Sequence, residues 1–127
     1  MNEALYKSVL EQDRAAIVIC DTRHTIVYMN PTAIRRYEKR GGAALIGKSL
    51  LACHNPNSCE LIEKVVSWFR ESAQNNMIYT YHNQKENKDV YMVALRDDKG
   101  ELIGYYEKHE HRDPECAALY DFSNSLI

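Results

Sequence analysis

Cys53 and His54 place a thiol and an imidazole side by side in the run Cys-His-Asn-Pro-Asn-Ser, residues 53–58. Neutral imidazole is a good iron ligand, and a thiolate is both a nucleophile and a metal ligand. The pair stands just before an amphipathic segment, so we expect it where a helix begins. Haem ligation, metal binding and catalysis are the reactive interpretations of this pair. The alternative is that His54 hydrogen-bonds a backbone carbonyl at the break before the helix.

The spacing around this pair argues against a metal centre and against nucleophilic catalysis. Structural zinc sites use four ligands in paired short spacings, whereas Cys59 lies outside any such pair with Cys53 and the next donors, His109 and His111, are far off in sequence. Adjacent side chains tend to point apart, and no orienting group accompanies the thiol. We therefore expect neither a metal site nor an enzyme. His109 and His111 are expected at a solvated strand end.

The composition is typical of one globular domain. The chain has 127 residues, 45% of them hydrophobic and 27% charged, with a formal net charge of -2. The charges are mixed and form no basic face, which argues against a nucleic-acid partner. No apolar run approaches the ~20 residues that cross a bilayer, and the N-terminus lacks a signal-peptide pattern. We expect a cytoplasmic protein that is not membrane-bound and whose four cysteines are free thiols.

Periodicity and turn residues predict the elements that position the pair. Asn30 and Pro31 have the types preferred at a helix N-cap and first turn. A longer amphipathic helix is predicted to open near Asn57, with Glu60 as its capping partner. Helical segments are predicted at residues 3–12, 31–39 and 45–51 and from 57 onward. Strands are predicted at residues 15–20, 25–29, 78–82, 90–96 and 102–111.

Residues 90–96 are apolar on both faces of the predicted strand. Val90, Met92 and Ala94 alternate with Tyr91, Val93 and Leu95. One face of the sheet packs on the domain's own helices, so the other needs a second cover. That cover is either the N-terminal helix or a second subunit.

Three segments in this order resemble a PAS domain. Residues 25–33, Thr-Ile-Val-Tyr-Met-Asn-Pro-Thr-Ala, are similar to the second strand and the Asn-initiated helix of that family. Residues 45–50, Leu-Ile-Gly-Lys-Ser-Leu, resemble the step before its long helix, and residues 96–105 with Arg112-Asp113 resemble its last hairpin. The implied fold is α+β, a five-stranded antiparallel sheet with helices over one face and an N-terminal helix.

The resemblance also implies boundaries and a subtype. It divides the chain into an N-terminal helical cap (1–14), a PAS domain (15–113) and a short C-terminal tail (114–127). Residues 53–58 are similar to the Cys-His-Pro-Pro-Lys-Ser run of the PAS module in some hemerythrin-like bacterial proteins, although Asn55 and Asn57 replace its Pro and Lys. Pro114 follows Asp113 where many PAS domains have Asp-Ile-Thr, so the usual signalling helix is not expected to continue from the strand.

The function implied by the resemblance is sensory. A small molecule or cofactor in a pocket between the long helix and the sheet would shift the packing of that helix. One alternative is a haem-binding redox or gas sensor that uses His54, and another is a ligand-free dimerisation module. The expected protein partners are a second copy of the chain, bound through the outer sheet face and the N-terminal helix, and a signalling protein. Alternation and family geometry give the expected pocket residues: Ile17, Ile19, Tyr28, Ile34, Leu50, His54, Ile62, Val66, Tyr79, Met92 and Tyr105.

Overall fold

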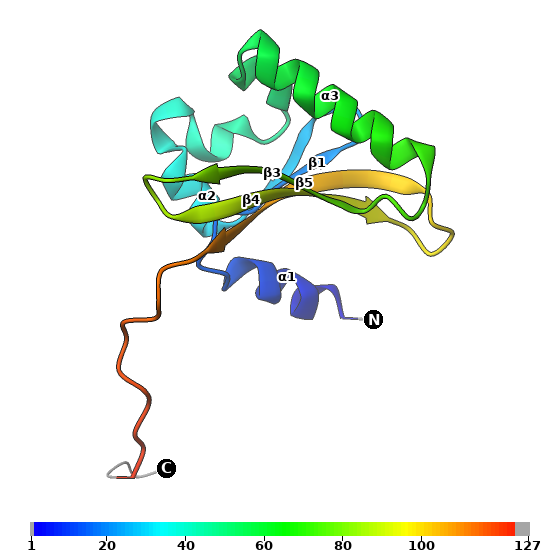
Figure 1. Cartoon of the computed structure of the whole chain (residues 1–127). Coiled ribbons are helices and arrows are strands. Elements are labelled where there is room, and N and C mark those ends of the chain that lie inside the picture. The colour runs from blue at the N-terminus through cyan, green and yellow to red at the C-terminus, as the bar shows by residue number, and fades with distance from the viewer. Residues whose placement is uncertain (1, 124–127) are drawn as a thin grey trace.

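A computed structural model describes residues 2–123 and shows one antiparallel sheet between two layers of helix (Figure 1). The sheet has five strands in the order β2-β1-β5-β4-β3. The strands are β1 (Val18–Asp21), β2 (Ile26–Met29), β3 (Met77–Asn83), β4 (Lys88–Arg96) and β5 (Leu102–His111). The α-helices are α1 (Glu3–Glu11), α2 (Pro31–Arg36) and α3 (Pro56–Glu71), with short 3-10 helices η1 (Glu38–Arg40), η2 (Gly42–Leu45) and η3 (Leu50–Cys53). The predicted α+β architecture is confirmed.

Asn30 joins three elements at the edge of the core. Its side chain is fully buried, and its Oδ1 accepts hydrogen bonds from the backbone N–H groups of Ile17 and Ala33, each at 2.9 Å. Its Nδ2 donates to the carbonyls of Leu10 at 3.0 Å and Ala15 at 2.9 Å. The predicted N-cap of α2 is therefore also the residue that fastens the end of α1 and the lead-in to β1.

Helix α3 begins at Pro56, one position before the predicted opening. Asn55 caps it, since the Asn55 Oδ1 accepts from the Ser58 N–H at 2.8 Å, and Pro56 occupies the first turn. The predicted capping partner Glu60 instead lies 3.1 Å from Lys64. With Asn55 as the N-cap, the capping-box position N3 is Ser58, and Glu60 lies two residues beyond it. The buried stripe of α3 is Ile62, Val65, Val66 and Phe69.

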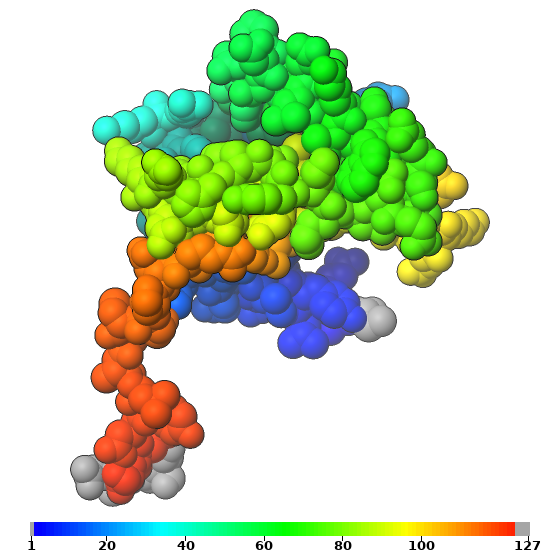
Figure 2. Space-filling model, viewed as in Figure 1, coloured from blue at the N-terminus to red at the C-terminus, as the bar shows by residue number. Residues whose placement is uncertain are grey.

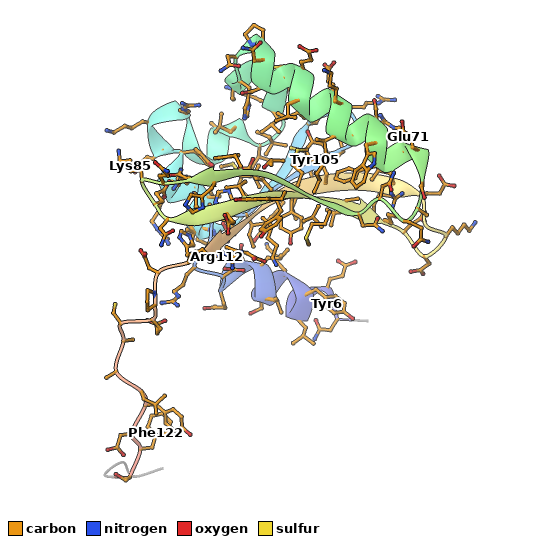
Figure 3. The ribbon with its side chains drawn as sticks, viewed as in Figure 1. Tyr6, Glu71, Lys85, Tyr105, Arg112 and Phe122 are labelled. Carbon is orange, nitrogen blue, oxygen red and sulfur yellow. The ribbon has the colours of Figure 1, made fainter. Side chains whose placement is uncertain are left out.

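The two faces of the sheet have different covers. The inner face packs against α3 and the 3-10 helices, whereas α1 lies on the opposite side, as Figure 3 shows for Tyr6. The Tyr28 hydroxyl of β2 donates to the Glu11 carboxylate of α1, which ties that helix to the outer face. The N-terminal helix thus supplies a cover for part of the outer face, one of the two covers predicted.

The chain leaves the sheet after β5. Residues 112–123 extend away from the domain without forming a helix (Figures 1 and 2). Glu115 still contacts the body of the domain through Arg14, at 3.1 Å. Within residues 2–123, no helix combines the length and the apolar character required to cross a membrane.

Candidate functional site

A cavity of about 120 Å³ lies between the inner face of the sheet and the helical layer. Its apolar wall comes from β1, β2, β4 and α3 and includes Val18, Cys20, Ile26, Met29, Ile62 and Met92. Its polar lining is concentrated in side chains from the helical layer and β5, namely Tyr37, Arg40, His54, Tyr105, Glu107 and His109. An apolar cavity with a few convergent polar groups is the usual form of a small-molecule site.

The structure brings five of the eleven predicted pocket residues to this cavity. They are Leu50, His54, Ile62, Met92 and Tyr105. Figure 3 shows Tyr105 in the layer between α3 and the sheet. These residues come from η3, the break after it, α3, β4 and β5, so the predicted convergence of the long helix and the last two strands is present. Whether they contact a ligand remains a prediction.

Four other predicted residues lie on the outer side of the sheet, so their assignment to the pocket lining is wrong. Ile19 pairs with Tyr28, and Ile17 lines a groove beneath α1. Successive side chains of a strand point to opposite faces, and Val18 and Cys20 take the inner positions of β1. Tyr79 is 56% exposed, stacks on Tyr91 and donates to Asp89 at 2.7 Å.

The remaining two predicted residues belong to the core rather than to the cavity wall. Val66 is 1% exposed and packs inside the buried cluster. Ile34 of α2 is partly buried against the same cluster. Both pack against the buried cluster, but neither is among the residues that line the cavity.

His54 makes the backbone hydrogen bond that was the alternative to a reactive role. Its Nδ1 lies 2.8 Å from the Leu50 carbonyl oxygen. A carbonyl only accepts, so Nδ1 carries the proton and the Nε2 lone pair is available. The neighbouring thiol of Cys59 donates to the Leu51 carbonyl at 3.2 Å. Both side chains therefore stabilise the turn of η3 that leads into α3.

Haem does not fit this cavity. The tautomer of His54 would suit iron ligation through Nε2, but the volume of about 120 Å³ limits the ligand. Sites for drug-sized ligands begin at about 300 Å³, and a porphyrin belongs at or above that size. Among residues 2–123, no three His, Cys, Asp or Glu side chains are grouped as a metal site requires.

The cavity wall contains a buried thiol that is unreactive at neutral pH. Burial raises the pKa of Cys20 to about 12, so the thiolate is not formed at neutral pH. Tyr105 also has a raised pKa, first because it is buried, and its hydroxyl lies 2.7 Å from Nδ1 of His24. Cys20 and Tyr105 thus line the cavity as neutral groups.

A row of hydrogen-bonded polar side chains at one end of the cavity was not predicted from the sequence. The His109 side chain is only 5% exposed, which overturns its predicted place at a solvated strand end. His109 pairs with Val90 of β4 and Glu107 pairs with Met92, so both lie on the inner face. Lys88, two positions before Val90, is buried beside them. The alternation from Val90 and Met92 also places Lys88 on this face, but His109 and Glu107 share it only through the pairing of β5 with β4, which no local pattern predicts.

The same row of polar side chains extends to helix α2. Arg36 holds Glu86 by two hydrogen bonds of 2.6 and 2.7 Å, and Glu86 lies 3.3 Å from the Lys88 ammonium. The hydrogen bonds from Arg36 are the main reason that the pKa of Glu86 falls to about 2. Glu86 is therefore an anion at neutral pH and compensates the charge of Lys88.

A second cavity lies on the other side of β5, beneath α1. It has a volume of about 220 Å³ and is lined in part by Val9 and Leu10 of α1. Ala16, Glu107 and His109 line both cavities. These three residues form a shared wall between the inner cavity and the groove under α1.

An antiparallel five-stranded sheet with helices and a cavity on one face defines the class of this protein as a small α+β domain. A model of the PAS domain family matches residues 6–109, and the chain belongs to that family. PAS domains are typically sensory modules of signal transduction and are generally not catalytic. The narrower resemblance to the module of hemerythrin-like proteins remains a prediction.

Solved structures share this fold at low sequence identity. A C-terminal domain from Streptococcus mutans has a TM-score of 0.67 at 19% identity, covering 87% of this chain and 85% of that one. The PAS domain of a protein from Colwellia psychrerythraea gives 0.63 at 15% identity, with 86% and 95% covered. The histidine kinase ThkA, in complex with the response regulator protein TrrA, gives 0.58 at 15% identity, with 89% and 32% covered. The search of curated proteins gives no match.

Proposed function

We propose that this chain is a cytoplasmic sensory domain that binds a small organic molecule in the cavity between the sheet and α3. The observation that carries the proposal is the cavity itself, an apolar space with polar side chains gathered along part of its wall. An engineered apolar cavity of about 150 Å³ admits benzene. The volume of about 120 Å³ therefore suits a ligand with roughly one small ring or a short branched chain.

The proposed response is a change in how the helical layer packs on the sheet. Ile62 of α3 and Leu50 of η3 line the cavity from the helical side, and Met92 lines it from the sheet. A ligand between them changes the relative stability of alternative packings, by no more than its difference in affinity for them. The altered surface would be read by a signalling protein; ThkA, a structural neighbour, was solved in complex with a response regulator.

Native mass spectrometry of the purified chain tests the ligand directly. We expect a population with a small bound mass in addition to the bare chain. Val18→Phe places a ring in the cavity and should abolish that population, because the ligand and the ring occupy the same space. Ile19→Phe is the matched control, since it adds the same ring at the next position on the outer face. Bare chain alone in every sample, or equal loss in both variants, would contradict the proposal.

The second candidate function is homodimerisation through α1 and the outer sheet face. No residue of α1 is buried, and Leu5, Tyr6 and Val9 are 62%, 54% and 68% exposed. Three neighbouring apolar side chains on one short helix favour a contact with a second copy.

We expect light scattering to give a dimer mass at micromolar concentration and Val9→Glu to shift it to the monomer. The new carboxylate would have to lose its water in the interface. Ser8→Glu introduces the same charge at the adjacent exposed position and serves as the control. A monomer mass for the unaltered chain at the highest attainable concentration would refute the dimer.

A further inference from the structure

Lys88 is a lysine with almost no access to solvent. Its side chain is 1% exposed, and its ammonium lies 3.3 Å from Oε2 of Glu86 and 3.1 Å from Nδ1 of His109. A buried ammonium is stable only when anions and acceptors surround it. The second contact is the informative one, because it fixes the state of His109.

The Lys88 contact determines which nitrogen of His109 carries the proton. An ammonium group has three donors and no lone pair, so Nδ1 of His109 must accept. The ring is then neutral with its proton on Nε2, which lies 2.9 Å from Oε1 of Glu107 and donates to it. Lys88, His109 and Glu107 thus form a directional chain that ends on a carboxylate at the cavity wall.

Glu107 is consequently a fixed acceptor with unused capacity. Oε1 is held by His109, whereas Oε2 has no hydrogen-bond donor among residues 2–123. The side chain is 42% exposed and lines the cavity. The Glu107 charge also acts on Tyr37, another residue of the cavity wall. The pKa of Tyr37 is raised first by burial and then by the charge of Glu107.

The other charged side chain of the cavity is less well placed to select a ligand. Arg40 is exposed, and its guanidinium makes a long contact of 3.4 Å with the Cys53 carbonyl. Side-chain entropy opposes ordering such an exposed arginine around a ligand. A bound anion would also lie in the field of the Glu107 carboxylate, which raises its energy.

We propose that Glu107 selects the ligand of this cavity, and that the ligand is a small molecule with a benzene-sized apolar body and one N–H or O–H donor. The apolar body occupies the space beside Val18, Ile26 and Met92, and the donor bonds Oε2 of Glu107. The inference rests on the proposed function, because it assumes that the cavity binds a ligand.

The test is an NMR titration of the full chain with four probes of similar size. Aniline carries a neutral N–H donor, benzylammonium a cationic one, toluene no donor and benzoate an anion. We expect aniline to bind at least about tenfold more tightly than toluene, the factor typical of one hydrogen bond to a charged group. Benzoate should be the weakest. Amide shifts should concentrate at residues lining the cavity, and the two donor probes show whether a neutral or a charged donor is preferred.

Two variants assign the preference to Glu107. Glu107→Leu removes the acceptor and should bring aniline and toluene to equal affinity. Glu107→Gln keeps a neutral acceptor, so it should weaken benzylammonium more than aniline, and it serves if the leucine variant does not fold. Glu101→Leu, at an exposed position just before β5, is the matched control and should retain the tenfold difference.

The outcomes separate the inference from the proposed function. If toluene or benzoate binds as tightly as aniline, the cavity holds ligands but Glu107 does not select them, and the inference fails alone. If aniline is preferred but Glu107→Leu and Glu107→Gln leave the preference unchanged, the inference also fails. If no probe shifts the cavity residues, both the proposed function and the inference are overturned.

Discussion

Replacing Asn30 by alanine is expected to lower the free energy of unfolding by about 3–5 kcal/mol, the sum of a lost N-cap and several unsatisfied buried groups. The side chain is fully buried and forms 2.9 Å hydrogen bonds with the N–H groups of Ile17 and Ala33. It also bonds the carbonyls of Leu10 and Ala15. Alanine offers none of these contacts, and the site is closed to compensating water. Urea unfolding followed by circular dichroism measures the change.

The chain contains a matched control for this substitution. Asn55 caps α3 through one hydrogen bond at 2.8 Å, but its side chain lies at an exposed position. Asn55→Ala should therefore cost only about 1 kcal/mol, the usual value of an exposed N-cap. Asn30→Asp should fall between the two, because it keeps the cap but places a carboxylate against two carbonyl oxygens. Equal costs for the two alanine variants would show that the junction around Asn30 is not the main source of its stability.

Gly104→Ala is expected to destabilise the domain by about 3 kcal/mol or more, at or beyond the upper end of overpacking effects. A Cβ at position 104 would lie 2.4 Å from the carbonyl oxygen of Cys20. That oxygen belongs to the backbone of β1, which pairs with β5 at Asp21 and Gly104, so only a displacement of one strand relieves the clash. Thermal unfolding should show a loss of many degrees in the melting temperature.

Gly47→Ala separates this steric effect from backbone strain. Gly47 has a φ of +93°, which a residue with a side chain adopts only at a cost, but nothing lies within 4 Å of the Cβ position. Its replacement should cost about 1–2 kcal/mol from conformation alone. The Gly104 variant should also weaken probe binding, since Cys20 and Tyr105 line the cavity across the same pair of strands. A melting temperature for Gly104→Ala above that of Gly47→Ala would contradict the steric explanation.

Local signals predicted most of the fold because they act within a few residues. Asn30-Pro31 determines the start of α2, and the β-branched and aromatic residues of 90–96 predict the strand β4, although both of its faces are apolar. The cavity was harder to predict. Residues 15–20 are almost uniformly apolar, so alternation cannot show which set points inward. Pairing with β5, more than eighty positions later, sets that phase and turns Ile17 and Ile19 outward.

The polar end of the cavity depends on even more distant partners. Lys88 and His109 have types that usually lie at the surface. Their burial follows from a cross-strand arrangement in which Lys88, Glu86 and Glu107 compensate one another around a neutral imidazole. Nothing local to either residue signals that arrangement. His54 shows the opposite case, since its local setting predicted its backbone hydrogen bond, which the structure shows.

The shared wall formed by Ala16, Glu107 and His109 means that only the sheet itself separates the inner cavity from the groove under α1. The inner cavity and the groove under α1 are lined by these same residues, so a displacement of β5 at Glu107 and His109 alters the shape of both spaces. An occupant of the inner cavity that displaces this strand would therefore also change the surface that α1 covers.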